Sequence, residues 1–355
     1  MFDRSVQLSS RHHGRKKQMK QNNAGLLLSR RDALVGGLGA GTLALPFIAS
    51  AQQAWPNRPI TMIVGFPPGG QTDFAARILQ QGLSSALGQG VVIDNRGGAG
   101  GNLGTDAVLR ARPDGYTLLA GNANPLTINP HTFQGMTIDP LRLTPVGMML
   151  KSSLILCVHP SVPAKTPQEF AAWTRQQDGG KGVNYGSGSA GSLTHVAMEM
   201  FKNRIGNPPM EHVPYRGSGP ALQDFIVNRF SAMFDGASVM APFIRANQIR
   251  GMLTTGTQRI PAFPDIPTSA EQGLQDFSFT AWVGLFGPPG LPDEIVQRLN
   301  SALNQAVQDT AVRDRITAQG DEPGGGTAEE LGTTMHNDHA RWGEVVRANN
   351  IRADA

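Results

Sequence analysis

One cysteine among 355 residues is the most restrictive shortage in this sequence. Cys157 excludes an internal disulfide, and its place in the apolar run 154–158 predicts a buried strand residue. The glycine-rich run 97–102 lacks the lysine of a Walker motif. Neither Ser187 nor Ser189 has glycines two residues away on both sides, so no nucleophile elbow is present. These absences argue against a disulfide scaffold, a P-loop NTPase and an α/β-hydrolase.

Clusters of metal-binding side chains are also lacking. His195 and Glu199 lie one helical turn apart, as do His336 and His339, but neither pair has a third ligand near it in the sequence. We therefore interpret both pairs as solvated helix faces and expect no metal and no other cofactor. For His195 a second interpretation stays open, because it falls in the first turn of a predicted helix that begins at a glycine-rich turn.

Excess positive charge is confined to the first 51 residues. The chain has 31 Lys and Arg against 27 Asp and Glu, and residues 1–51 hold eight of the basic and two of the acidic ones. The remaining 304 residues therefore carry 23 basic and 25 acidic side chains, a net charge near −2. No basic surface for nucleic acid is expected in this part of the chain.

Long hydrophobic runs are absent as well. The apolar segment 33–48 is shorter than the ~18 residues that a membrane-spanning helix needs. It follows the pair Arg30-Arg31 and precedes the small residues 49–51, the pattern of a twin-arginine-like signal peptide cleaved after Ala51. We predict that residues 1–51 direct export to the periplasm; an uncleaved anchor is the alternative. The n-region is long, so translation starts at either Met1 or Met19.

Short β-branched runs alternate with segments of helical period, which predicts an α/β fold with parallel strands. The expected strands are 60–66, 91–94, 117–120, 154–159, 183–185, 212–215, 231–234, 249–254 and 279–286. Thr166 and Thr327 each precede a capping-box glutamate, and Ser218 is expected to cap another helix. Strands 154–159 and 279–286 are expected to cross between domains, dividing the chain into 52–156 with 283–355 and 157–282.

Two glycine-rich turns, each after a strand and before a helix, are the most informative motifs. The first is 65–73, with Gly69, Gly70 and Thr72, and the second is 186–192. Such turns leave backbone N–H groups unpaired at a helix start, where the helix dipole also favours negative charge. Two of them, more than a hundred residues apart, predict an anion held from two sides in a cleft.

The second turn also admits an enzymatic interpretation. Gly186, Gly188 and Gly191 match G-x-G-x-x-G, the dinucleotide-binding pattern, which makes an exported NAD(P)-dependent oxidoreductase the alternative function. Against it, the acidic residue about twenty positions on is Glu211, which precedes its strand. Asp235 follows another strand and either faces the cleft or forms a turn with Gly236.

A series of segments carries a family resemblance, in order from about Trp55 to Ile351; it includes 59–73, 94–102, 113–119, 184–187, 212–218, 233–235 and 263–268. Together these segments resemble the Bug family, the substrate-binding proteins of tripartite tricarboxylate transporters. Gln71 departs from the pattern, because a glycine or small residue is usual at its position; this departure predicts an altered choice of ligand. A second departure, 227–230, is expected to affect only a surface turn.

The resemblance implies a two-domain periplasmic-binding-protein (Venus-flytrap, type II) fold, no catalysis, and a carboxylate bound in the cleft between the lobes. It also implies membrane permease subunits as partners, and we expect a monomer; a sensor is the alternative partner. The residues predicted to bind the ligand are Phe66, Pro68, Gly69, Gly70, Thr72, Asp73, Asn122, Asn124, Ser187, Gly188, Ser189, Ser192, His195 and Asp235.

Overall fold

A computed structural model of the chain describes residues 55–353, which all belong to one compact unit. The predicted signal peptide, 1–51, lies outside the described residues. No helix within 55–353 is long and apolar enough to cross a membrane. Strands and helices alternate along most of this part of the chain, as the sequence predicts.

The described strands are joined in one sheet with the order β2-β1-β3-β9-β4-β7-β5-β6, and β8 and β10 also pair with β4. The bounds of the strands are β1 Ile60–Val64, β2 Val91–Asn95, β3 Thr117–Asn122, β4 Thr144–Val158, β5 Val183–Ser187, β6 Met210–Pro214, β7 Ala232–Gly236, β8 Arg250–Thr254, β9 Thr280–Gly287 and β10 Glu322–Gly325. The pairs β1–β2, β1–β3, β5–β6 and β5–β7 are parallel, while β9 runs antiparallel to β3 and β4.

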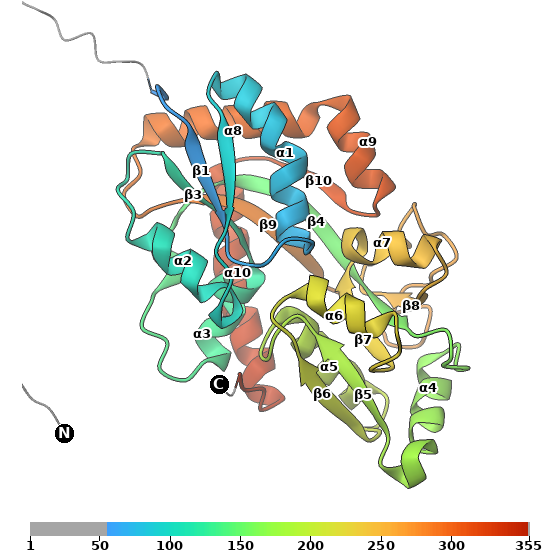
Figure 1. Ribbon diagram of the computed structural model, residues 1–355. Helices are drawn as coiled ribbons and strands as arrows, with labels where there is room; N and C mark the ends of the chain where they lie inside the picture. The colour runs from blue at the N-terminus through green and yellow to red at the C-terminus, as the bar shows by residue number, and fades with distance from the viewer. Residues whose placement is uncertain (1–54, 354–355) are drawn as a thin grey trace, which may run out of the picture. The chain divides into compact units, whose positions relative to one another are not determined.

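The long strand β4 belongs to both halves of the sheet. Its residues up to Ser153 pair with β9, and its residues from Leu154 pair with β7. We call the part built on β1, β2, β3, β9 and β10 the first lobe and the part built on β5 to β8 the second lobe (Figure 1). The chain returns to the first lobe just before Thr280, which pairs with Ser153. The domain division at 156/157 and 282/283 itself stays a prediction.

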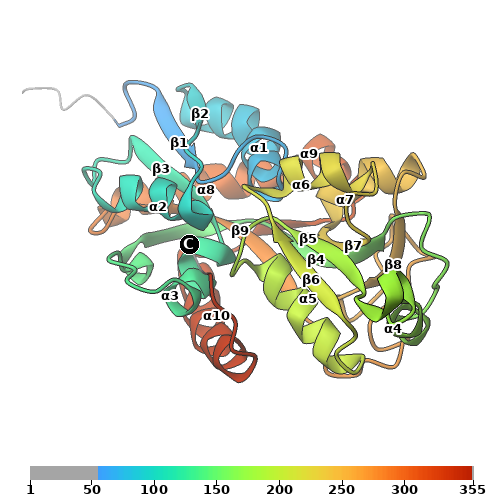
Figure 2. The ribbon, with the colours of Figure 1, turned by 60° about the horizontal axis from the view of Figure 1, so that its bottom comes forward.

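Helices cover both faces of the sheet in the first lobe. One face packs against α1, α8 and α9, and the other against α2, α3 and α10 (Figures 1 and 2). Alternate residues of β1 point to opposite faces of the sheet. Met62 and Val64 pack in the core under α1, α8 and α9, whereas Ile63 packs in the core on the side of α2 and α10. The helices of this lobe are α1 Gln71–Leu87, α2 Asn102–Leu109, α3 Asn129–Thr132, α8 Asp293–Gln308, α9 Thr310–Ala318 and α10 Ala328–Ala348, with short turns η1 Ala99–Gly101, η2 Asn124–Ile128 and η3 Pro140–Arg142.

The second lobe repeats this layering with fewer elements. Helices α4 (Pro167–Thr174) and α5 (Leu193–Arg204) pack on one face of its strands, while α6 (Ser218–Phe225) and α7 (Ala237–Arg245) pack on the other. The short turn η4 is Gln177–Gly180. Cys157 is fully buried in the layer of α6 and α7, as predicted.

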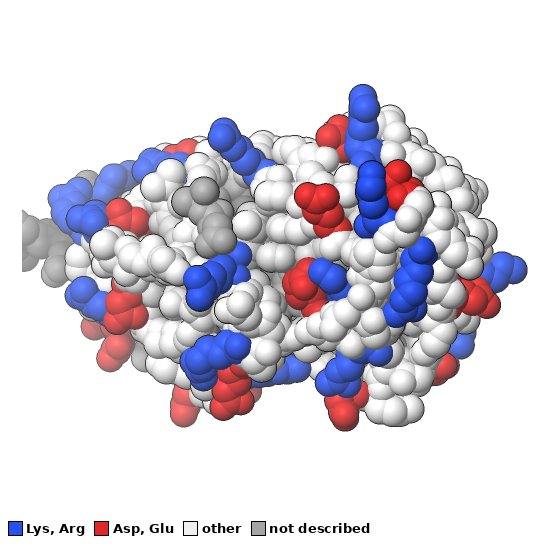
Figure 3. Space-filling model, turned by 90° about the horizontal axis from the view of Figure 1, so that it is seen from below, with Lys and Arg blue, Asp and Glu red and all other residues white. Residues whose placement is uncertain are grey.

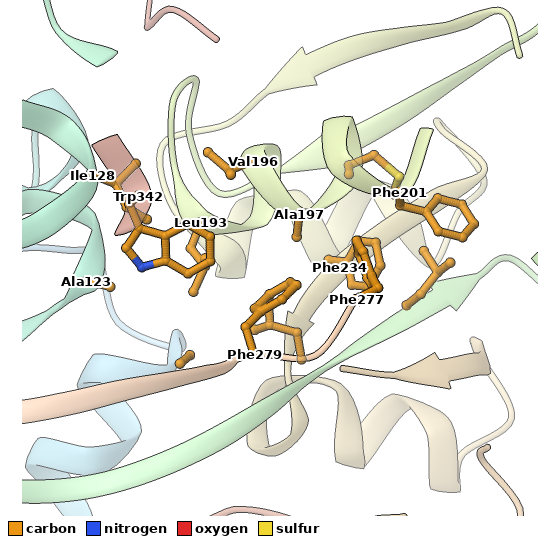
Figure 4. Close-up of a cluster of buried hydrophobic side chains, with 14 of the residues drawn as sticks. Ala123, Ile128, Leu193, Val196, Ala197, Phe201, Phe234, Phe277, Phe279 and Trp342 are labelled. Atoms are coloured by element: carbon orange, nitrogen blue, oxygen red, sulfur yellow. The ribbon is translucent and has the colours of Figure 1, made fainter. Parts of the chain in front are cut away.

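A row of aromatic side chains joins the two lobes on the face of α5 and α10. Trp342 of α10 meets Phe279 edge to face at 5.6 Å between ring centroids, and Phe279 meets Phe277 at 5.3 Å. Phe277 in turn contacts Phe234 of β7 and Phe201 of α5 (Figure 4). Because these side chains are buried, the row forms an apolar seam between the lobes.

The boundaries of several elements differ from the sequence prediction. Strand β4 begins ten residues earlier than predicted, in a stretch containing glycine, proline and methionine that has low strand propensity. The three glycines 324–326 are typical of a loop, but Gly324 and Gly325 lie in β10; a Cβ at Gly324 would come within 2.3 Å of Met148 O. Ser218 is the first helical residue of α6, not its cap, which is Gly217.

Charges are mixed on the surface seen in Figure 3, where basic and acidic side chains alternate without a broad area of one sign. One ion pair between exposed side chains joins Arg259 to Glu271 at 3.0 Å. This face therefore offers no extended basic patch for a polyanion.

A buried carboxyl holds the junction between the lobes. Asp321 precedes β10 and is 2% exposed. Its Oδ1 accepts hydrogen bonds from Ser152 of β4 and from the Ser238 N–H in the first turn of α7, while Ala237 N–H donates to Ser152 Oγ. Burial raises the pKa of Asp321 to about 6, and the charge of Asp235 adds to this effect. The carboxyl thus ties the start of a second-lobe helix to the first lobe.

Asp321→Asn should reduce the dependence of stability on pH. The pKa is higher in the folded protein than the 3.8 of an unperturbed carboxyl, so the folded state binds the proton more tightly between pH 4 and 6. The free energy of unfolding therefore falls as pH rises through this range, by up to ~3 kcal/mol for a shift of this size.

Urea denaturation of the wild type and of Asp321→Asn at pH 4.5 and 7 measures this contribution. The variant should lose less stability on going to pH 7, because an amide does not ionise. The matched control is Asp276→Asn, which changes an exposed carboxyl. An equal pH dependence in the wild type and Asp321→Asn would contradict the assignment.

Candidate functional site

A cavity of about 60 Å³ lies between the lobes, where the strands β1, β3, β5 and β7 reach their carboxyl ends. Ligands of open α/β sheets bind at this edge. Both lobes contribute to the wall, together with one residue each of the crossing strands β4 and β9. The lining residues are Phe66, Pro67, Gly70, Gln71, Thr72, Asn122, Ala123, Asn124, Leu154, Gly188, Leu193, Thr194, Gly217, Ser218, Asp235 and Ala281.

The loop between β1 and α1 forms one side of the cavity. Gly70 is the N-cap of α1, in extended conformation and without a side-chain cap. The N–H groups of Gln71 and Thr72 have no acceptor within the helix, because they lie in its first turn. A Cβ at Gly70 would lie 3.9 Å from Ser218 Cβ, which shows how closely this loop approaches α6 (Figure 1).

Asp73 and Gly69 shape this loop from outside the cavity. Asp73 is 4% exposed and accepts hydrogen bonds from Gly69 N–H, Arg77 and Asn95. Burial by itself would raise the pKa of Asp73, but these hydrogen bonds outweigh it and lower the pKa. Its oxygens are thus committed to holding the turn in place.

Two asparagines at the end of β3 join the lobes. Asn122 donates to Thr72 Oγ1 at 2.9 Å and accepts from Asn124 N–H at 3.2 Å. Asn124 Oδ1 accepts the N–H of Leu193, the first residue of α5, at 2.8 Å. The last bond links the first lobe directly to a helix start in the second lobe.

The loop between β5 and α5 forms the opposite side, and buried side chains hold its shape. Ser192 caps α5, and Gly188 N–H donates to Thr194 Oγ1 at 3.1 Å. Ser187 is fully buried and its Oγ lies 2.6 Å from His212 Nε2. The expected solvation of His195 is wrong: it is 8% exposed, stacks on His212 at 3.8 Å and accepts from Gly191 N–H.

Neither of these histidines supplies a positive charge at neutral pH. Burial lowers the pKa of His195 to about 4 and that of His212 to about 3. No Lys, Arg or His is among the residues that line the cavity. Of the described residues, no three His, Cys, Asp or Glu side chains are placed to hold a metal ion.

The start of α6 is a third side of the cavity that the sequence prediction missed. Gly217 has φ +118°, and its N–H donates to Gly188 O at 2.7 Å. Ser218, in the first turn of α6, lines the cavity beside it. Gly217 lies between β6 and α6. A glycine between a strand and a helix is also the sequence signal from which the other two turns were predicted.

A wider groove of about 670 Å³ is lined in part by the same residues, Phe66, Pro67, Gly188 and Gly217. Its wall also includes Pro68, Ser189, Asn95, Tyr215, Arg216 and the glycine-rich run 97–101. Arg216 is exposed and is the one basic residue among the residues that line the cavity or the groove.

The predicted ligand-binding residues therefore fall into three groups. The cavity is lined by Phe66, Gly70, Thr72, Asn122, Asn124, Gly188 and Asp235. The groove is also lined by Pro68 and Ser189. The third group does not line the cavity or the groove but makes hydrogen bonds that fix the shape of the two loops: Gly69, Asp73, Ser187, Ser192 and His195. Gln71, Leu193 and Thr194 line the cavity but were not among the predicted residues.

Comparison with known families identifies this arrangement. The model of the tripartite tricarboxylate transporter family receptor matches residues 75–351. The chain belongs to this family. The receptor is 34% identical to protein BugT of Bordetella pertussis over 295 residues, which are 82% of this chain and 90% of BugT. The family resemblance seen in the sequence is confirmed.

Solved structures agree with the family assignment. A Rhodopseudomonas palustris protein solved with adipate has a TM-score of 0.80 and 31% identity, covering 84% of the receptor and 99% of that protein. MatC of the same species, solved with malate, has a TM-score of 0.77 and 30% identity, covering 82% and 100%. The predicted two-lobe solute-binding fold is confirmed, and the receptor is a binding protein rather than an enzyme.

The oxidoreductase alternative receives no support from these comparisons. The packing also gives another reason for two of its glycines. A Cβ at Gly186 would meet the Phe230 ring at 2.3 Å, and a Cβ at Gly191, with φ +69°, would meet Thr132 and Ala353 within 2.7 Å. Close packing therefore requires glycine at these positions without a dinucleotide.

Asn124→Ala should loosen the link between Asn122–Asn124 and α5. It removes the acceptor of Leu193 N–H, and a hydrogen bond of this kind contributes about 1 kcal/mol. The amide of Leu193 should exchange its hydrogen about fivefold faster or more, as measured by NMR or mass spectrometry.

The control for this experiment is Asn337→Ala, at an exposed position of α10. It should leave exchange at Leu193 unchanged. Equal protection of Leu193 in Asn124→Ala and the wild type would show that the link does not exist in solution.

Proposed function

We propose that the receptor captures a small carboxylate in the cavity between its lobes. The observation that carries the proposal is the convergence of three helix starts, those of α1, α5 and α6, on a cavity without a basic side chain. N–H groups at helix starts attract anions, and hydrogen bonds to a charged acceptor are stronger than neutral ones. The relatives solved with adipate and malate support the same class of ligand.

The predicted ligand-binding residues have distinct roles in this proposal. Gly70, Gly188 and Asn124 contact the ligand, because they line the cavity from both lobes. Thr72 presents its hydroxyl, whose oxygen already accepts from Asn122 and is left with its hydrogen to donate. Asp73, Ser187, Ser192 and His195 act indirectly by holding the two loops in shape.

The receptor's partners follow from its family. We infer that the lobes close around the ligand by a hinge motion near β4 and β9, and that the closed form docks on the membrane permease subunits of a tripartite transporter. A sensor protein is the alternative partner. We further propose that the receptor works as a monomer in the periplasm, after export directed by residues 1–51.

A thermal-shift screen tests the proposed ligand class. Mono-, di- and tricarboxylates, aromatic acids, acidic amino acids and NAD(P) are each added to the purified receptor. A carboxylate present at 100 times its dissociation constant should stabilise the folded state by ~2.7 kcal/mol and raise the melting temperature. Stabilisation by NAD(P) alone would overturn the proposal in favour of a dinucleotide-binding protein.

Gly70→Val tests the place of binding. The backbone of Gly70 has φ −93°, which any residue adopts, and the nearest atom to an added Cβ lies 3.9 Å away. The valine side chain therefore fits the fold but occupies the cavity. Affinity for the best carboxylate of the screen should fall at least tenfold by titration calorimetry.

Gly90→Val is the matched control, because this exposed glycine precedes β2, has ordinary backbone geometry and has open space at its Cβ. It should bind like the wild type. If Gly70→Val keeps full affinity while its melting temperature is unchanged, the cavity is not where the carboxylate binds.

A further inference from the structure

Asp235 presents an unused hydrogen-bond acceptor to the cavity. The carboxyl is 4% exposed, and its Oδ1 accepts from Gly236 N–H at 2.8 Å. Oδ2 has no partner at hydrogen-bonding geometry, and the Ser218 hydroxyl is the one side-chain donor near enough to lower the pKa of Asp235 against the larger effect of burial. A buried carboxylate oxygen without a donor is costly, and natural sites seldom leave one unpaired.

The other side chains of the cavity have the opposite character. Asn122 Oδ1 accepts from Asn124 N–H, Asn124 Oδ1 accepts from Leu193 N–H, and Thr194 Oγ1 accepts from Gly188 N–H. These acceptors are already engaged. Gln71 Nε2, by contrast, is a buried donor without a partner. The cavity therefore combines donors for an anion with one free charged acceptor.

No cation in the wall compensates Asp235. The residues that line the cavity include no Lys, Arg or His, and the buried carboxyl of Asp321, on which the charge of Asp235 acts, carries the same sign of charge. A ligand made only of carboxylate and hydrocarbon would bring its negative charge close to Asp235 with nothing between them. A ligand that also carries a donor would satisfy Oδ2 and reduce this repulsion.

We propose that the ligand carries a hydroxyl or ammonium group on the carbon next to its carboxylate, and that this group donates a hydrogen bond to Asp235. The inference rests on the proposed capture of a carboxylate and narrows it to 2-hydroxy and 2-amino acids. The carboxylate lies at the amide donors of the helix starts, and the neighbouring donor reaches Oδ2. A volume of about 60 Å³ suits this head of the molecule, while the remainder extends toward the groove that shares Phe66 and Gly188.

Titration calorimetry with matched acids tests this proposal on the unaltered receptor. Each series keeps the carbon chain and changes one substituent: propionate, lactate and alanine; succinate, malate and aspartate; glutarate, 2-hydroxyglutarate and glutamate. In the series that binds best, a 2-substituted acid should bind at least fivefold more tightly than its parent. A smaller difference, or tighter binding of the parent acid, overturns the proposal. The hydroxy and amino members show which donor is used.

Asp235→Asn assigns the preference to this residue. Gly236 N–H keeps an acceptor only if the amide oxygen faces it, so the NH₂ group takes the place of Oδ2 and points a donor into the cavity. The preference for the 2-amino acid should disappear or reverse, because an ammonium group cannot accept a hydrogen bond from this NH₂ group. The preference for the 2-hydroxy acid should change less, because a hydroxyl can both donate and accept. Asp338→Asn, a carboxyl that accepts from Trp282 outside the cavity, should keep the wild-type preference.

The outcomes separate this inference from the proposed function. If no carboxylate binds at all, the proposed function fails. If carboxylates bind but the 2-substituent makes no difference, only the inference about Asp235 fails. A preference for the 2-amino acid that persists in Asp235→Asn also overturns it, because another group then recognises the ammonium group. The comparison of acids on the wild type decides the proposal even if the variant does not fold.

Discussion

The shared strand β4 is the constraint on which the rest of this receptor depends. Its first part completes the sheet of one lobe and its last five residues are hydrogen-bonded into the sheet of the other. The change of pairing partners therefore lies between Ser153 and Leu154, where β4 passes from one lobe to the other. Leu154 itself lines the cavity, so the cavity adjoins the point where the lobes meet.

The junction has a polar side and an apolar side. On the polar side, Asp321 and Ser152 hold the first turn of α7. On the other, the aromatic row from Trp342 to Phe234 forms a largely apolar seam. Hydrogen bonds fix direction, whereas apolar contact tolerates sliding. The junction therefore combines directional hydrogen bonds with a non-directional apolar contact.

The cavity owes its unusual electrostatics to helix starts, because no basic side chain lines it. Helix starts supply partial positive charge without a mobile or ionisable side chain, and the buried histidines behind the second loop are neutral at pH 7. Asp235 then stands out as the one charge in the cavity wall. In a site whose donors are fixed in the backbone, a single acceptor has a large effect on which acid is accepted.

The sequence by itself determined the fold class, the family and two of the three turns, because strand-turn-helix units carry their signals locally. Glycines after a short apolar strand mark such a turn whatever surrounds it, and seven of the predicted residues line the cavity. Only the tertiary structure decided that α6 borders the cavity, that His195 and Asp73 hold the two loops without lining it, and that Leu193 and Thr194 line it. These roles depend on distances between residues far apart in the chain, such as Asn124 with Leu193. Strand β10 escaped prediction for the same reason: its glycines are strand residues only because Met148 of β4 packs against them.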